Sequence, residues 1–135
     1  MPEKKTILIV EDKANCFTYF KTKIEKYLKE KGIEGEILWA KSPEEAKAII
    51  DENRNAINAL FCDTNLDANH LETSEGIEVA MHFGDTEKTI GMSSDPRWWQ
   101  KEWEEKGFVF INKEDIQETG LNEELPEEIR NLIGS

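Results

Sequence analysis

The chain has 135 residues, of which 38% are hydrophobic and 34% charged, and its formal net charge is −12. This composition is typical of a globular protein, predicts one domain over residues 1–135, and excludes a largely disordered chain. So acidic a surface repels phosphate groups, which argues against nucleic acid and anionic membranes as partners.

The N-terminal segment carries no targeting signal. Residues 6–10 are the only apolar stretch before Glu11, and this is too short for a signal peptide, so the expected location is the cytoplasm. Cys16 and Cys62 lack a CxxC spacing and are expected to be reduced thiols. Together with His70 and His82 they match no usual zinc-binding pattern.

The first half of the chain alternates strand and helix patterns. Residues 6–10 are β-branched and apolar, which is typical of a buried strand, and a helix ended by Gly32 follows. Its apolar face is predicted to carry Phe17, Phe20, Ile24, Tyr27 and Leu28. Residues 36–40 predict a second strand. A capping box with proline at the first helical position, Ser42-Pro43-Glu44-Glu45, then predicts a helix that ends near residue 53.

The second half repeats this alternation three times. Strands are predicted at 59–62, 89–92 and 108–111. The helices after them are predicted to carry Ile77, Ala80 and Met81 in the first, Trp98, Trp99 and Trp103 in the second, and Ile129, Leu132 and Ile133 in the last. The second of these helices begins at Asp95-Pro96, and at least one of its tryptophans is expected to be partly exposed. Five βα units predict a doubly wound α/β fold, a parallel sheet with helices on both faces.

Polar residues follow four of the predicted strands. Glu11 and Asp12 end the first, Asp63 the third, Ser93 the fourth, and Lys113 comes shortly after the fifth. Parallel strands place such residues at one edge of the sheet, where α/β proteins bind ligands. Carboxylates gathered there repel one another unless a cation neutralises them, and Mg²⁺ is the usual cation for oxygen ligands. A carboxylate, a metal, an ammonium group and a hydroxyl are what phosphoryl transfer to aspartate requires.

These residues, in this order, resemble the receiver domains of two-component response regulators, over residues 6–113. The resemblance implies a flavodoxin-like sheet of order 2-1-3-4-5, with Asp63 as phosphoacceptor for a histidine kinase or histidine phosphotransfer protein. It implies that Mg²⁺ is bound by Glu11, Asp12, Asp63 and the backbone carbonyl of Asn65. Ser93 and Lys113 would then contact the phosphoryl group, with Ser94 as the neighbouring alternative to Ser93, and Phe110 would be the aromatic switch residue.

The sequence departs from the pattern of that family in two places. Thirteen positions separate Asp63 from Gly76, which is long for the loop after the acceptor, and Glu114 replaces the usual proline after the lysine. These departures leave the acceptor chemistry in place and concern the surface that a downstream protein would contact.

Three functions are therefore compared. The first is a stand-alone receiver, a phosphoacceptor that gains and loses its own phosphoryl group rather than a turnover enzyme. The second is a phosphorylation-independent interaction module that binds a protein through the 64–75 loop and the tryptophan helix. The third, a small aspartate phosphatase, is disfavoured because Asn65 stands where an Asp-x-Asp motif has its second aspartate.

Overall fold

The computed structural model describes residues 4–64, 75–93, 96–113 and 125–134, of which 96–98 are described by their backbone alone. The predictions made for Asn65, His70, Ser94 and Asp95, and for the loop and acidic segments at 65–74 and 114–124, lie outside these ranges.

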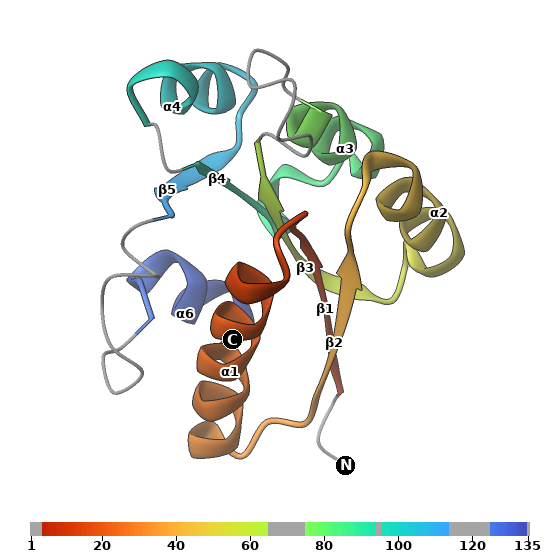
Figure 1. Cartoon of the computed structure of the whole chain (residues 1–135). Helices are drawn as coiled ribbons and strands as arrows, with labels where there is room; N and C mark the ends of the chain where they lie inside the picture. Colours follow the sequence, from red (N-terminus) through yellow and green to blue (C-terminus); the bar gives the residue numbers. More distant parts are fainter. Residues whose placement is uncertain (1–3, 65–74, 94–95, 114–124, 135) are drawn as a thin grey trace.

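Five parallel strands form one sheet in the order β2-β1-β3-β4-β5, which confirms the predicted topology (Figure 1). The strands are β1 Lys5–Val10, β2 Gly35–Ala40, β3 Ile57–Asp63, β4 Thr89–Ser93 and β5 Val109–Asn112. Two of the three interior strands, β1 and β3, are almost wholly buried towards their C-terminal ends. Burial on both faces explains why they read as unbroken apolar runs and not as alternating patterns.

Helices cover both faces of the sheet (Figure 1). The helices are α1 Ala14–Lys31, α2 Pro43–Asn53, α3 Glu75–Phe83, α4 Pro96–Glu105 and α6 Glu127–Gly134, with a short 3₁₀ turn η1 at Thr86–Lys88. Successive strand residues point to opposite faces, so Ile7 and Ile9 pack with α1 and α6, whereas Leu8 and Val10 pack with α2, α3 and α4. Within the described ranges, no helix has both the length and the apolarity to cross a bilayer.

Two of the predicted helix ends are confirmed in detail. The Ser42 hydroxyl accepts a hydrogen bond from the backbone N–H of Glu45 at 3.1 Å, as the capping box predicts. Gly32 adopts φ = 70° at the end of α1, and the N–H of Ile33 then bonds the carbonyl of Leu28 at 2.8 Å. Glycine is favoured there because a left-handed backbone costs it no steric strain.

The face of α3 is rotated from the predicted one. Met81 was expected in the core, but 56% of its surface is exposed, and Phe83 is buried instead. Gly76, Val79, Ala80 and Phe83 recur at the spacing of one helical face, and Met81 lies outside it. The expectation for the tryptophan helix is met, because Trp103 is fully buried and Trp99 is partly exposed.

Gly76 allows α3 to begin directly against the end of β3. Its N–H bonds the carbonyl of Thr64 at 2.9 Å, and a Cβ at this position would collide with the backbone carbonyl of Asp63. The close approach brings the start of α3 to the edge of the sheet that carries the polar residues.

We therefore expect Gly76→Ala to lower the free energy of unfolding by about 3 kcal/mol or more, because neither backbone can move without breaking strand or helix bonds. Gly107→Ala is the matched control. Its Cβ would meet only Thr86, at 3.7 Å, so it should cost only the left-handed strain at φ = 88°, about 1 kcal/mol. Urea denaturation measures both, and equal costs would contradict the close-approach argument.

Candidate functional site

The strand ends deliver acidic and basic side chains to one edge of the sheet. Val10 pairs with Cys62, Asp63 with Met92 and Ser93 with Asn112, so β1, β3, β4 and β5 end side by side. The pairing continues one residue further, because the N–H of Lys113 bonds the carbonyl of Ser93 at 2.9 Å. The residues that follow these strands are therefore neighbours in space although they are far apart in the sequence.

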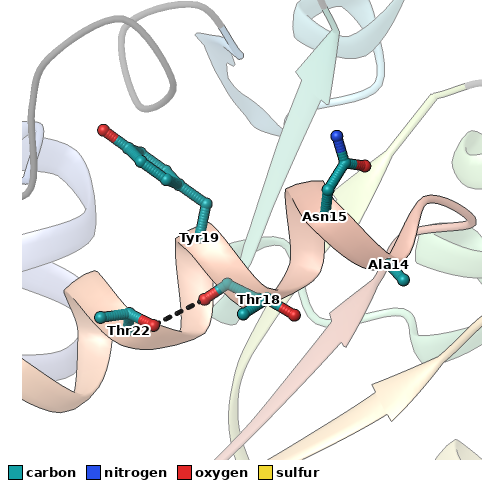
Figure 2. A pocket seen from close by; sticks show the side chains of 5 residues that line it. All are labelled: Ala14, Asn15, Thr18, Tyr19 and Thr22. Atoms are coloured by element: carbon teal, nitrogen blue, oxygen red, sulfur yellow. Dashed lines mark hydrogen bonds between the residues drawn. The ribbon is translucent and has the colours of Figure 1, made fainter.

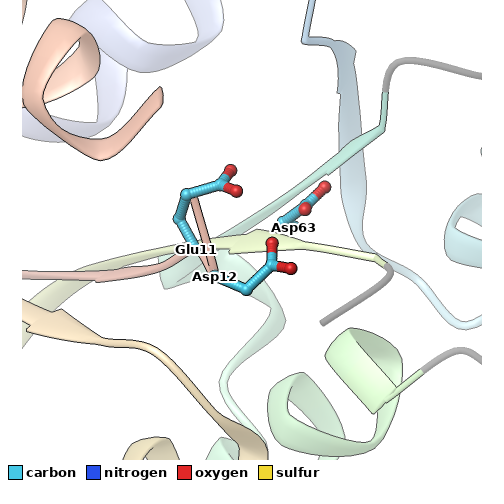
Figure 3. Close-up of side chains that lie close together, drawn as sticks. All are labelled: Glu11, Asp12 and Asp63. Carbon is cyan, nitrogen blue, oxygen red and sulfur yellow. The ribbon is translucent and has the colours of Figure 1, made fainter. Parts of the chain in front are cut away.

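Glu11, Asp12 and Asp63 gather at this edge, as predicted (Figure 3). One carboxylate oxygen from each lies within 4.8 Å of the others. Glu11 and Asp63 are buried, with 2% and 7% of their surface exposed, and Asp12 is half-buried. Three negative groups held so close in a poorly hydrated place must bind protons or a cation.

Lys113 supplies a positive charge to the acidic cluster. Its Nζ lies 2.5 Å from Glu11 Oε2 and 3.3 Å from Asp63 Oδ2, and its side chain is 9% exposed. Burial alone would lower its pKa, but the charges of Asp63 and Glu11 outweigh burial and raise the pKa above its ordinary value. Lys113 is therefore firmly protonated at neutral pH.

One ammonium group does not neutralise the acidic cluster. Burial, followed by the charge of Asp63, raises the pKa of Glu11 to about 7 in spite of Lys113. Burial also raises the pKa of Asp63 to about 6, and the charge of Asp12 adds to this rise. Near neutral pH the cluster therefore binds protons more readily than free carboxylates do.

The donor set fits a hard divalent cation. Asp12 Oδ1 is buried and has no hydrogen-bond partner among the described residues, so a strong acceptor is left directed into the cluster. Carboxylate oxygens are the ligands that Mg²⁺ prefers, and it binds through one or two of them while it keeps several waters. Glu11, Asp12 and Asp63 are therefore suitable ligands, and Asn65 lies outside the described residues.

Ser93 and Phe110 lie where the sequence places them. Ser93 is the last residue of β4 and is buried, at the same edge as Asp63 and Lys113. Phe110 lies two register positions back from that edge, opposite Gly91, and is 9% exposed in the core beneath α4. Cys16 and Cys62, both within the described residues, form no disulfide, and His82 lies on the surface of α3, 2.8 Å from Asp51 Oδ1.

Several supporting contacts were not foreseen from the sequence. The indole N–H of Trp39 donates to the backbone carbonyl of Glu11 at 2.7 Å, and the N–H of Lys13 donates to Glu11 Oε1 at 3.1 Å. Thr64, the residue after Asp63, is bonded to Trp103 from α4. Each contact except that of Lys13 joins distant positions, so no local pattern in the sequence could have revealed it.

A shallow hollow lies along the N-terminal half of α1 (Figure 2). It is open to solvent, has a volume of about 530 Å³, and is lined by Ala14, Asn15, Thr18, Tyr19 and Thr22. Its first lining residue follows Asp12 by two positions.

Solved structures of receiver domains share this architecture. A response regulator receiver domain protein from Clostridium thermocellum matches with a TM-score of 0.68 at 19% identity, covering 96% of this chain and 94% of its own. The signal receiver domain of a protein described as a LuxO repressor, from Vibrio parahaemolyticus, matches with a TM-score of 0.59 at 18% identity, covering 82% of this chain and 79% of its own. A chain of the CheX–CheY–BeF3–Mg²⁺ complex from Borrelia burgdorferi gives 0.57 at 18% identity, covering 80% and 77%.

No protein-family model and no curated protein sequence matches this chain. The chain has the fold of a response regulator receiver domain, as the sequence predicts, and at these identities the likeness is one of fold.

The raised pKa values give Lys113 a pH-dependent role in stability. Between about pH 4 and pH 7 the folded protein keeps protons on Glu11 and Asp63 that the unfolded chain releases, so their contribution to stability is lost as the pH rises through 6 and 7. We expect Lys113→Met to cost about 3–5 kcal/mol at pH 8, where both carboxylates are charged, and about half of that at pH 5.

Urea denaturation of the variant at both pH values measures this difference. Lys4→Met is the control, because it removes a lysine whose ion pair with Glu36 is half-exposed, and no measurable change is expected at either pH. Equal costs of Lys113→Met at pH 5 and pH 8 would show that the two carboxylates do not gain protons when the lysine is lost.

Proposed function

We propose that this protein is a receiver that accepts a phosphoryl group on Asp63 from a phosphohistidine donor and signals through contact with other proteins. The observation that carries the proposal is the buried group at the sheet edge, in which Glu11, Asp12 and Asp63 meet and Lys113 contacts two of them. A structural ion pair alone would not require a third carboxylate with an unsatisfied buried oxygen.

Phosphoryl transfer requires little of the protein beyond position and charge. A carboxylate oxygen of Asp63 forms a bond to phosphorus while the phosphorus–nitrogen bond of the donor histidine breaks. The imidazole nitrogen keeps the bonding electron pair and takes a proton from solvent. Water later attacks the acyl phosphate, which releases inorganic phosphate and restores the Asp63 carboxylate.

Lys113 and Ser93 are the groups that receive the phosphoryl oxygens in this proposal. Lys113 already contacts Asp63 and, once the carboxylate becomes an acyl phosphate, its ammonium group is available to the new anionic oxygens. Ser93 adds a hydroxyl at the neighbouring strand end, and Phe110 lies in the core behind it as the proposed switch residue. These groups are positioned before the reaction, so no large reorganisation opposes it.

Mg²⁺ is the proposed cofactor, held by Glu11, Asp12, Asp63 and the backbone carbonyl of Asn65. When bound, it neutralises charge on the carboxylates and on the transferring oxygens. Asp12 then gains a partner for its unsatisfied oxygen.

The proposed partners are a histidine kinase or histidine phosphotransfer protein and a downstream protein. The hollow beside α1 is lined by Ala14, two positions after Asp12, so a donor lying against it could bring a phosphohistidine to Asp63. The similar chain from Borrelia burgdorferi comes from a complex of two proteins with BeF3 and Mg²⁺, which fits this mode of action. Trp99, partly exposed on α4, is one candidate contact for the downstream protein.

Phosphorylation is tested by intact-protein mass spectrometry after incubation with a small phosphodonor and Mg²⁺. We expect one phosphoryl adduct on the wild-type protein and none on Asp63→Asn, because the amide cannot attack phosphorus. Asp51→Asn makes the same change at an exposed position on α2 and should be phosphorylated normally. Absence of an adduct on the wild type at high donor concentration would favour the phosphorylation-independent interaction module.

Mg²⁺ binding is tested by thermal melts with and without the ion. At about ten times its dissociation constant, Mg²⁺ should stabilise the wild type by about 1.4 kcal/mol. Asp12→Asn should lose most of this effect and should be more stable than the wild type without the ion, because one of three repelling charges is removed.

Glu52→Gln is the control for Asp12→Asn, since it removes one negative charge from an exposed site on α2. It should respond to Mg²⁺ as the wild type does. If the ion stabilised Asp12→Asn as much as the wild type, the proposed metal site would be in the wrong place.

A further inference from the structure

Thr64, which directly follows Asp63, is fixed by hydrogen bonds on every side and has no exposed surface. Its N–H contacts Asp63 Oδ1 at 3.1 Å and the carbonyl of Met92 at 2.9 Å. Its hydroxyl donates to the same Met92 carbonyl at 2.7 Å, and its own carbonyl accepts from Gly76 at 2.9 Å. Thr64 therefore joins β3 to β4 and α3 while its amide faces the acidic side chain.

The Thr64 hydroxyl also accepts a hydrogen bond from α4. Trp103 Nε1 donates to Thr64 Oγ1 at 2.7 Å, across 39 positions in the sequence, and the indole is completely buried. β4 makes room for this ring at Gly91, where any Cβ would collide with the indole. The hydrogen bond and the glycine are two independent observations that the Trp103 ring packs α4 onto the sheet.

We propose that Trp103 is a positioning residue for Asp63, and that the seat of α4 on the sheet thereby sets the reactivity of the acceptor carboxylate. The inference rests on the proposed phosphoryl acceptance and adds regulation to it. The N–H of Trp103 fixes Thr64, and Thr64 holds its amide against Asp63. Because such coupling is reciprocal in equilibrium terms, a protein that binds α4 should change the acceptor site, and phosphorylation should change α4.

The geometry indicates that the hydrogen bond from Trp103 to Thr64 does more than give the buried indole N–H an acceptor. A buried indole N–H needs an acceptor, and any backbone carbonyl would serve. Here the acceptor is the side chain next to Asp63, and its hydroxyl both donates and accepts, so it has no freedom to rotate. Both links, from Trp103 to Thr64 and from Thr64 to Asp63, lie in the interior, where hydrogen bonds are stronger and more directional than in water.

The test compares rates of phosphorylation by a small phosphodonor at saturating Mg²⁺. Trp103→Phe removes the indole N–H, and Thr64→Val removes the hydroxyl. Gly91→Ala keeps both polar groups in the protein but displaces the indole that carries one of them. We expect each to slow phosphorylation of Asp63 by about fivefold, the change that corresponds to one neutral hydrogen bond. Thr64→Ser keeps the hydroxyl and should restore a rate within about twofold of the wild type.

Loss of packing alone is controlled by Ile129→Val, a fully buried substitution on the opposite face of the sheet. It should lower the melting temperature without slowing phosphorylation. The double variant Thr64→Val with Trp103→Phe should be no slower than the slower single variant, because both remove the same link. Wild-type rates in Thr64→Val and Trp103→Phe, or a similar slowing in Ile129→Val, would overturn the inference.

A second readout separates this inference from the proposed function. If the wild type accepts no phosphoryl group, the proposed function fails, and the link is then judged by Mg²⁺ titration calorimetry. Release of Thr64 frees the Asp63 carboxylate to turn, so Thr64→Val should bind Mg²⁺ about fivefold more weakly than Thr64→Ser. Equal Mg²⁺ affinity in these two variants would show that Trp103 and Thr64 do not position the Asp63 carboxylate.

Discussion

The buried charge group at the carboxyl edge of the sheet is the constraint on which the rest of this structure depends. Glu11 and Asp63 are withdrawn from water, and Lys113 forms an ion pair with each of them. Buried ions stabilise a fold only where geometry compensates for their lost hydration, so the strands that carry them must end in register. The parallel ladder of β1, β3, β4 and β5 meets that requirement.

The incomplete neutralisation of this group is informative about function. A purely structural ion pair would match its charges, whereas here the pKa of Glu11 and that of Asp63 are both raised even though Lys113 is in contact with both. Clusters of ionisable residues with perturbed pKa values are commonly sites where a cation binds or a reaction occurs. The unsatisfied oxygen of Asp12 is suited to a cation, and in the proposed function Asp63 receives an anionic phosphoryl group beside it.

The same edge is connected to the helices by short polar contacts. Gly76 brings the start of α3 against the end of β3, and Trp103 brings α4 into contact with Thr64. Tight packing makes such elements switch between discrete positions instead of deforming smoothly. In our proposal, a charge change at Asp63 reaches α4 through Thr64, whose N–H contacts Asp63 and whose hydroxyl contacts Trp103.

The strand order was implied by the resemblance to receiver domains, and the sequence by itself determined the parallel α/β class, the two-faced helical cover and the group of residues at the sheet edge. It did so because apolar runs, the capping box at Ser42 and the glycine at 32 act locally, and because parallel strands have a fixed direction. Only the tertiary structure decided which contacts hold these residues. The rotation of α3 that exposes Met81, the bond of Trp39 to Glu11 and the bond of Trp103 to Thr64 depend on how helices pack on the sheet. Packing joins positions far apart in the chain, and no local pattern encodes which of several apolar or aromatic residues will meet.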